Sequence, residues 1–291
     1  MKKQNRKLNK SLPFIYKHLK INSSNNEPIG VDLRYHEFDK PIPLFVFCHG
    51  FKGFKDWGFF PYMMEKLSEN GIFTVSFNFS RNGLDNNLNN PEEFTKLDLF
   101  RYNTITQELN DLDRVLDFLE ASSNNYNYNF NKLVISGHSR GGGVAILKTS
   151  EDKRIKKLIC LAPISTFDRY GKHIKQIWKD RGFIEIENVR TKQKMPMDFS
   201  YLRDLEINKN KFDILAAIKK VSIPTLIIHG DADISVDISE AEALFEHSNK
   251  KLTQFIKLQN SNHTFGATHP FISTNDTIDY IIKRISEFVI E

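Results

Sequence analysis

Apolar residues along the chain follow two alternating patterns: short continuous runs, and positions spaced as on one face of a helix. The runs predict buried strands over residues 44–48, 72–79, 132–136, 157–161, 225–229 and 255–258. The helical spacing predicts helices over residues 61–70, 98–120, 141–149, 239–247 and 275–289. Strands and helices that alternate in this way predict an α/β fold, with a mostly parallel, doubly wound sheet covered by helices on both faces.

Two further segments precede this alternation. Residues 12–21 and 29–38 have the composition of strands, and the polar stretch from Asn22 to Pro28 joins them. This arrangement predicts an N-terminal antiparallel hairpin. Residues 122–131 are rich in Ser, Asn and Tyr, and we expect a surface loop there, between a helix and a strand.

The alternation is interrupted once, between Pro163 and Thr225. About sixty residues separate the strands on either side, which is too long for an ordinary connection and predicts an insertion with structure of its own. We take residues 164–222 as this insertion, within a single domain of residues 12–291. It is interpreted as a lid over a site, with a helical decoration of the sheet edge as the alternative.

The distribution of charge along the chain bears on whether the protein binds nucleic acid. The chain of 291 residues has 41 Lys and Arg against 36 Asp and Glu, and a net charge of +5 first suggests nucleic-acid binding. Seven of these bases precede the first acid, Glu27, and the rest of the chain has 34 bases against 36 acids. The positive excess therefore belongs to the N-terminus, where residues 1–11 are expected to form a basic tail. Nucleic acid is not an expected partner.

Composition also indicates the cellular compartment in which the protein is expected. No stretch approaches the roughly 18 consecutive apolar residues of a membrane span, and the N-terminal segment lacks the apolar core of a secretory signal. Two cysteines, Cys48 and Cys160, lie within predicted buried strands and cannot form a disulfide framework. With 40% hydrophobic residues and a mean hydropathy of -0.43, we expect a soluble globular protein of the cytoplasm.

Candidate chemistry begins at Gly137-His138-Ser139-Arg140-Gly141, which has the pattern Gly-x-Ser-x-Gly. The pattern alone also arises by chance, but here it directly follows a predicted strand and directly precedes a predicted helix. This strand–turn–helix setting is typical of a serine nucleophile. The turn brings backbone atoms so close together that only small side chains fit, which Gly137 and Gly141 satisfy. Ser139 is then exposed above the carboxyl edge of the sheet, at the positive end of the following helix.

A serine hydroxyl needs a general base, and the base needs an acid that orients it. In this topology both follow the serine along the chain, on loops after later strands. One such strand leads into Asp231 and Asp233, and the last predicted strand leads into His263. The residues themselves leave the choice between the two aspartates open. His263 is preferred to His269 as the base, because His269 lies farther from the strand end.

An oxyanion that forms on the substrate requires two backbone N–H donors. One belongs to the residue after the nucleophile, Arg140. The other belongs to the loop after an earlier strand, and here the strand that ends at Cys48 is followed by His49-Gly50-Phe51. Gly50 lets the backbone turn inward, so we expect the Phe51 N–H to point at the carbonyl oxygen of a substrate.

Four segments carry this chemistry: Phe47–Gly58, Gly137–Gly142, His229–Asp233 and Ser261–Phe265. Together they resemble the α/β-hydrolase superfamily, and within it the small esterases near the dienelactone-hydrolase and prolyl-oligopeptidase-like branch. The resemblance covers about residues 30–290. Many dienelactone hydrolases carry Cys as the nucleophile, and the serine of this chain indicates ordinary esterase chemistry instead.

The resemblance implies a role for each candidate residue. Ser139 is the nucleophile, His263 the base, and Phe51 and Arg140 the oxyanion donors. In the motif His-Gly-x-x-Asp the last position carries the acid, which selects Asp233 over Asp231. In such enzymes an insertion after the sixth core strand often forms a lid, and this favours the lid interpretation of residues 164–222.

The reaction implied is hydrolysis of a small-molecule carboxylic ester through an acyl-enzyme intermediate. It needs no metal and no organic cofactor, and the nine His and two Cys show no metal-ligand spacing. The alternatives are an acyl-thioesterase or a peptidase of the same fold, and a non-catalytic binding protein with a hydrolase fold. The complete set of catalytic residue types argues against the last of these.

Overall fold

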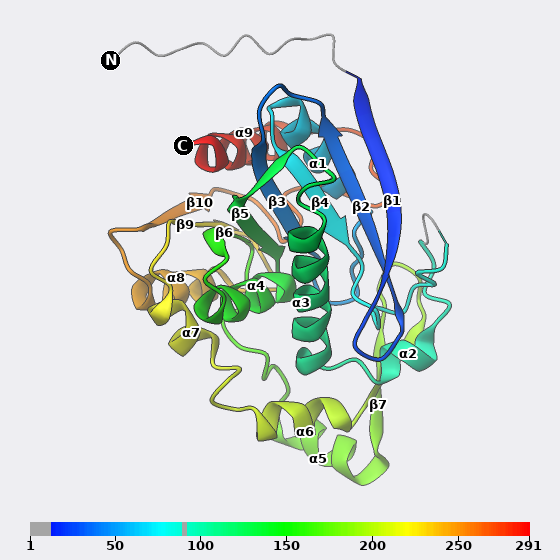
Figure 1. Ribbon diagram of the computed structural model, residues 1–291. Helices are drawn as coiled ribbons and strands as arrows, with labels where there is room; N and C mark the ends of the chain where they lie inside the picture. The colour runs from blue at the N-terminus through cyan, green and yellow to red at the C-terminus, as the bar shows by residue number, and fades with distance from the viewer. Residues whose placement is uncertain (1–12, 89–91) are drawn as a thin grey trace.

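An eight-stranded sheet runs through the part of the chain that the computed structural model describes, residues 13–88 and 92–291 (Figure 1). The expected basic tail of residues 1–11 lies outside the described residues. The strands stand side by side in the order β1-β2-β4-β3-β5-β6-β9-β10. Their bounds are β1 Phe14–Asn22, β2 Pro28–His36, β3 Ile42–Cys48, β4 Phe73–Phe77, β5 Tyr128–His138, β6 Ile155–Leu161, β9 Thr225–Gly230 and β10 Thr253–Leu258.

The direction of the strands agrees with the sequence pattern. β1 pairs with β2, and β2 with β4, in antiparallel register. From β4 to β10 every neighbouring pair in the sheet is parallel. The predicted mostly parallel sheet and its N-terminal antiparallel hairpin are therefore confirmed.

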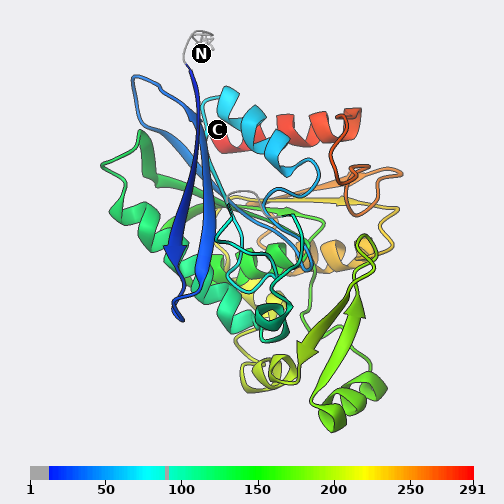
Figure 2. The same ribbon diagram turned by 90° about the vertical axis from the view of Figure 1, so that its right-hand side faces the viewer.

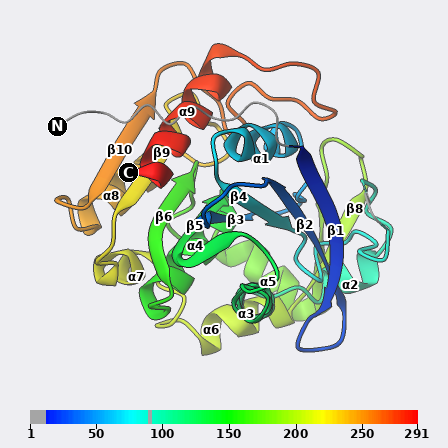
Figure 3. The same ribbon diagram turned by 45° about the horizontal axis from the view of Figure 1, so that its top comes forward.

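Helices cover the sheet on both faces (Figure 3). On one face lie α1 and α9, and on the other lie α3, α4, α7 and α8. Along β3, Phe45 and Phe47 pack under the first pair, while Leu44 and Val46 pack under the second group. This alternation explains why β3 is an unbroken apolar run. The helix bounds are α1 Phe60–Glu69, α2 Leu97–Arg101, α3 Ile105–Ala121, α4 Arg140–Glu151, α7 Ile214–Lys220, α8 Ile238–His247 and α9 Asp276–Ile290.

The single helix predicted over residues 98–120 is wrong, because the structure divides it into α2 and α3. Thr104 has extended backbone angles, and its hydroxyl accepts a hydrogen bond from the Gln107 N–H at 3.2 Å. This is an N-cap, and it starts a new helix at Ile105. The apolar residues that predicted the helix all lie in α3, so their spacing did not reveal the break.

The loop predicted over residues 122–131 is shorter than expected, because β5 begins at Tyr128. Tyr128 pairs with Ile42 of β3, and its buried ring contacts that of Phe73 at 4.8 Å between centroids. The strand pairing is irregular beyond this point. Burial of one aromatic ring has thus extended the strand into an Asn-rich segment.

Residues 164–222 contain three helices and a separate two-stranded antiparallel sheet (Figure 2). Besides α7, these elements are α5 Lys172–Arg181, β7 Phe183–Glu187, β8 Lys194–Asp198 and α6 Ser200–Ile207. The buried Trp178 stacks on Tyr201 at 5.8 Å, and Tyr170 meets its edge at 5.1 Å. These aromatic contacts give the segment a packed centre between α5 and α6.

Candidate active site

Ser139 lies in the sharp turn between β5 and α4. Its backbone has a φ of 55° and a ψ of -120°, in a region that only glycine adopts without strain. The Ser139 N–H donates to the Leu161 carbonyl oxygen at 2.9 Å, and its carbonyl oxygen accepts from the Gly142 N–H at 3.0 Å. These bonds maintain the strained turn at the carboxyl end of β5, where the side chain is partly exposed.

Both glycines of the motif lie against backbone atoms. A Cβ on Gly137 would lie 2.1 Å from the Gly141 carbonyl oxygen, and a Cβ on Gly141 would lie 2.3 Å from that of Cys48. Neither neighbour is the flexible end of a side chain, so a larger residue would displace the turn itself. The structure thus contains the close approach that the motif predicts.

Replacing Gly141 by alanine is expected to destabilise the protein by about 1–3 kcal/mol or more, because the methyl group overlaps with the backbone of β3. Gly171 is the matched control, since a Cβ there meets no atom within 4 Å and its φ is -65°. Thermal unfolding of both alanine variants provides the measurement. Equal melting temperatures for the two variants would show that the turn tolerates the added methyl group.

Asp233 and His263 lie together at the same sheet edge, after β9 and β10. Asp233 Oδ2 accepts a hydrogen bond from His263 Nδ1 at 2.7 Å. The other carboxylate oxygen accepts from the Ser235 and Val236 N–H groups at 2.8 and 2.9 Å. His229 Nε2 also lies 3.1 Å from Oδ2. A buried carboxylate with this many donors is fixed in one orientation, and so is the imidazole that it contacts.

The charge of Asp233 follows from these contacts. Burial on its own would raise the pKa of the carboxyl group, but the hydrogen bonds from His229 and His263 outweigh it and hold the pKa well below its usual range. The side chain is therefore ionised at neutral pH. A negative charge at this position stabilises the Nδ1–H form of His263, which leaves Nε2 free to accept a proton.

The histidine of the serine turn supports His263 from the other side. Burial, followed by electrostatic repulsion from the neighbouring His263, lowers the pKa of His138 to about 3, so the His138 ring is neutral at pH 7. Its Nε2 donates to the His263 carbonyl oxygen at 2.9 Å, and the two ring centroids lie 4.7 Å apart. The loop that carries His263 is thereby attached to the residue next to Ser139.

The two rival residues have other partners. The exposed Asp231 accepts a hydrogen bond from the Asn260 N–H at 2.6 Å. His269 Nδ1 accepts from the Gly58 N–H at 3.0 Å, and its ring stacks on Trp57 at 6.1 Å. Of the predicted acids and bases, the structure therefore brings Asp233 and His263 together and places Asp231 and His269 in other contacts.

The loop after β3 lies directly against Ser139. A Cβ on Gly50 would lie 3.0 Å from the Ser139 Cβ. Burial lowers the pKa of His49 to about 4, and its neutral ring donates from Nδ1 to the Gly50 carbonyl oxygen at 2.9 Å. Within the described residues, neither the Phe51 N–H nor the Arg140 N–H has a protein acceptor. Two free backbone donors beside the serine are what an oxyanion hole requires.

Sequence reasoning missed a buried ionic cluster under this loop. Lys55, whose side chain has 0% exposure, bonds through Nζ to Asp32 Oδ2 at 2.7 Å and also contacts Asp56. Asp32 in β2 further accepts from His18 Nδ1 at 2.7 Å and from Arg34 at 3.1 Å. The one signal in the sequence was the pair of charges, Asp32 and Arg34, in the segment predicted as the second strand of the hairpin.

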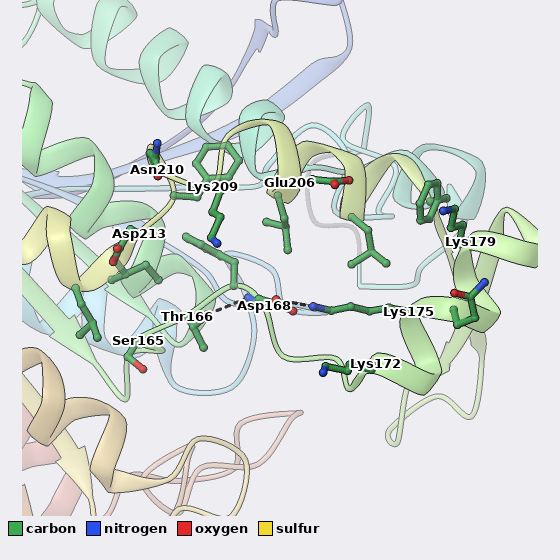
Figure 4. A pocket seen from close by; sticks show the side chains of 18 residues that line it. Ser165, Thr166, Asp168, Lys172, Lys175, Lys179, Glu206, Lys209, Asn210 and Asp213 are labelled. Atoms are coloured by element: carbon green, nitrogen blue, oxygen red, sulfur yellow. Dashed lines mark hydrogen bonds and ion pairs between the residues drawn. The ribbon is translucent and has the colours of Figure 1, made fainter.

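A groove of about 750 Å³ lies between α5, α6 and α7 of the inserted segment (Figure 4). Its floor is apolar, with Phe167, Phe212 and Ile214 buried. Lysines of α5 stand along its rim, and one of them, Lys175, pairs with Asp168 at 2.5 Å. Neither Ser139 nor His263 lines this groove. It is therefore a separate feature from the serine site.

Two negative findings concern metal sites and membrane spans in the described part of the chain. No group of three or more His, Cys, Asp or Glu side chains there is arranged to hold a metal ion. None of the helices within residues 13–88 and 92–291 combines the length and the apolar character needed to cross a membrane.

Comparison with known sequences gives two matches. A sequence model of the BD-FAE family matches residues 99–247, which include Ser139 and Asp233. "Putative esterase/lipase 1" of Mycoplasma pneumoniae is 27% identical over 165 residues. That alignment covers 47% of this chain and 61% of the relative, so the chain spans less than two thirds of that protein's length.

Solved structures share the fold at low identity. Est1E from Butyrivibrio proteoclasticus, with ferulic acid bound, is 18% identical with a TM-score of 0.69, covering 94% of this chain and 98% of Est1E. The alpha/beta hydrolase GrgF from Penicillium sp. sh18 is 15% identical with a TM-score of 0.68, covering 94% and 98%. These likenesses confirm the α/β-hydrolase fold that the sequence motifs predicted.

Proposed function

The chain belongs to the BD-FAE family, whose sequence model matches just over half of its length, and from this premise we propose that it is a serine hydrolase that cleaves carboxylic esters. The observation that carries the proposal is the contact between Asp233 Oδ2 and His263 Nδ1 at 2.7 Å. It occurs at the sheet edge where Ser139 stands in its strained turn. The esterase name of the Mycoplasma relative agrees with this reading.

In the proposed mechanism Ser139 Oγ attacks the ester carbonyl carbon while His263 Nε2 takes the hydroxyl proton. Asp233 stabilises the imidazolium that forms and keeps the ring in its productive orientation. His263 then returns the proton to the leaving alkoxide, which departs as the alcohol. The acyl group remains on Ser139, and a water molecule that His263 deprotonates hydrolyses it to the carboxylic acid.

The negative charge of each tetrahedral intermediate falls on the former carbonyl oxygen. We assign its two donors as the Phe51 and Arg140 N–H groups, which lack protein acceptors within the described residues. Each donor of this kind typically contributes about 10²–10³ in rate. The Arg140 N–H is also the first of helix α4, so the positive end of the helix dipole adds to the stabilisation.

The inserted segment is proposed as a lid over this site. Lys52, next to Phe51, donates from Nζ to the carbonyl oxygen of Glu187 at 3.0 Å, at the end of β7. The Arg190 guanidinium lies over the Phe54 ring at 5.8 Å. These contacts join the β7–β8 hairpin to the loop after β3, and they support the lid over the alternative of a helical decoration of the sheet edge.

A fluorophosphonate probe tests the proposal, because it phosphonylates only a serine that is activated as a nucleophile. We expect stoichiometric labelling that peptide mapping assigns to the fragment containing Ser139, and no labelling of the Ser139→Ala variant. Ser136, which is buried three residues earlier in β5, supplies the matched alanine control and should leave labelling intact. Absence of labelling in the wild-type chain, or labelling that survives Ser139→Ala, would contradict the serine mechanism.

A panel of substrates separates ester hydrolysis from the related reactions. It contains nitrophenyl esters of increasing acyl length, a thioester, a peptide anilide and a feruloyl ester, the last because Est1E binds ferulic acid. We expect kcat/KM to be highest for an ester. A higher value for the thioester or the peptide would assign the same catalytic residues to the other reaction, and labelling without any turnover would favour a binding protein.

A further inference from the structure

Arg140 has a side chain that the proposed mechanism does not use. Its guanidinium is buried, with 6% of the side chain exposed, in a position that burial makes costly for a charge. It lies over the Phe51 ring at 4.6 Å and over the Tyr201 ring at 4.8 Å. The flat cation is thus held between an aromatic ring of the loop after β3 and one of the inserted segment.

The counter-ion of Arg140 comes from a third element. Glu108 in α3 is buried, and its Oε1 lies 3.6 Å from Arg140 Nε. The same oxygen accepts a hydrogen bond from Asn103 Nδ2 at 2.7 Å, while Oε2 has no hydrogen-bond partner among the described residues. A buried carboxylate that is only half satisfied is expensive, so its presence calls for a specific explanation.

The Phe51 ring has a second neighbour besides the Arg140 guanidinium. It stacks on Phe100 of α2 with 5.7 Å between centroids and 29° between planes. The ring therefore has the Arg140 guanidinium and Phe100 as fixed neighbours. Because a side chain held in this way restricts its own backbone, the position of the Phe51 N–H depends on the position of the guanidinium.

Both proposed oxyanion donors thus belong to residues whose side chains contact each other. Arg140 supplies one N–H from its backbone, and through its side chain it also holds the residue that supplies the other. Glu108 holds the guanidinium through its opposite charge. The ring of Tyr201, in the inserted segment, packs on the guanidinium. We infer that Glu108 and Tyr201 are positioning residues, which act through the Arg140 side chain on the oxyanion hole. This inference rests on the proposed function.

A purely structural role is the alternative, in which the Arg140–Glu108 pair only stabilises the contact between α3 and α4. The two roles differ in what they change. Loss of packing lowers the melting temperature but leaves the folded enzyme with normal turnover. Misplaced oxyanion donors lower kcat and leave KM largely unchanged, because the interaction is made in the transition state.

Glu108→Gln removes the charge, keeps the shape and still accepts the bond from Asn103. We expect kcat to fall about 10- to 100-fold, with a parallel fall in the rate of fluorophosphonate labelling, because small displacements of oxyanion donors have effects of this size. Asp111→Asn is the matched control on the same helix. Asp111 is also buried, but its partners are Ser80 and Gln107. The kcat of the Asp111→Asn variant should therefore stay within about twofold of wild type.

Substitution of Tyr201 supplies a second test in the inserted segment. Tyr201→Phe keeps the ring over Arg140 and loses the hydroxyl that donates to the Phe167 carbonyl oxygen at 3.2 Å. Tyr201→Leu removes the ring. We expect the leucine variant to lose at least about fivefold more kcat than the phenylalanine variant, since it removes the ring over the guanidinium as well as the hydroxyl, which also contacts Arg140.

All kinetic measurements are made below the melting temperature of each variant, with the labelled fraction normalised to folded protein. Wild-type labelling rates in Glu108→Gln, or equal kcat values for the two Tyr201 variants, would overturn the positioning role while leaving the proposed function in place. Failure of the wild-type chain to label at Ser139 would overturn both.

Discussion

Replacing Asp233 by asparagine is expected to lower kcat about 10⁴-fold with little change in KM, as loss of the orienting carboxylate does in serine hydrolases. The asparagine oxygen can still accept from the Ser235 and Val236 N–H groups, so the loop should keep its shape. Its amide nitrogen then faces His263 Nδ1 and donates to it. The imidazole proton moves to Nε2, and the ring can no longer accept the proton of Ser139.

Asp231→Asn is the matched control, because the same substitution is made two residues away in the same loop. Asp231 contacts the Asn260 N–H and not His263, so we expect kcat within about threefold of wild type. Steady-state kinetics on the best ester of the panel provides the comparison. A larger loss in Asp231→Asn than in Asp233→Asn would transfer the role of the acid to the other aspartate.

Replacing Lys55 by methionine is expected to lower the free energy of unfolding by about 3–5 kcal/mol, the usual effect of removing one partner from a buried ion pair. The methionine fills most of the volume of the lysine, so the loss reflects charge. Asp32 would stay buried and Asp56 half-buried, with Arg34 as their nearest strong cation, at 3.1 and 3.6 Å. Two carboxylates would then share one guanidinium.

The same substitution at Lys66 provides the control. Lys66 pairs with Glu69 at 2.8 Å on the surface of α1, where both side chains are more than a third exposed. Exposed pairs of this kind contribute about 0–1 kcal/mol, so Lys66→Met should be nearly neutral. Urea denaturation measures the free energy of unfolding of both variants, and an m-value equal to that of the wild type makes the comparison valid. A loss below about 1 kcal/mol in Lys55→Met would show that the cluster adapts to the missing charge.

The sequence predicted the features of the fold that depend on neighbouring residues. Continuous apolar runs identified the parallel strands, because a strand buried on both faces is apolar at nearly every position. Element ends were less predictable. Thr104 interrupts a helix through one side-chain hydrogen bond, and the ring of Tyr128 extends a strand into a polar segment. Both effects depend on contacts that spacing does not encode.

The candidate site also has one part that the sequence predicted and one part that depends on the folded chain. The serine turn could be recognised because strand, glycines and helix follow one another directly, so that chemistry and local geometry coincide in one stretch of chain. The two aspartates after β9 are chemically identical and two residues apart. Their different partners, His263 for one and Asn260 for the other, arise from how the loop folds back against the loop after β10.

By itself, then, the sequence determined the position of the candidate nucleophile, the order of serine, acid and base along the chain, and the parallel sheet that brings their strands to one edge. The residues left two carboxylates open and the family motif selected Asp233, but only the tertiary structure shows its contact with His263 and how the loop of Phe51 is held. The supports of that loop, Lys55 with Asp32 and Arg140 with Glu108, join elements far apart in sequence. Burial gives these charges their partners, and burial is a property of the folded chain rather than of any local pattern.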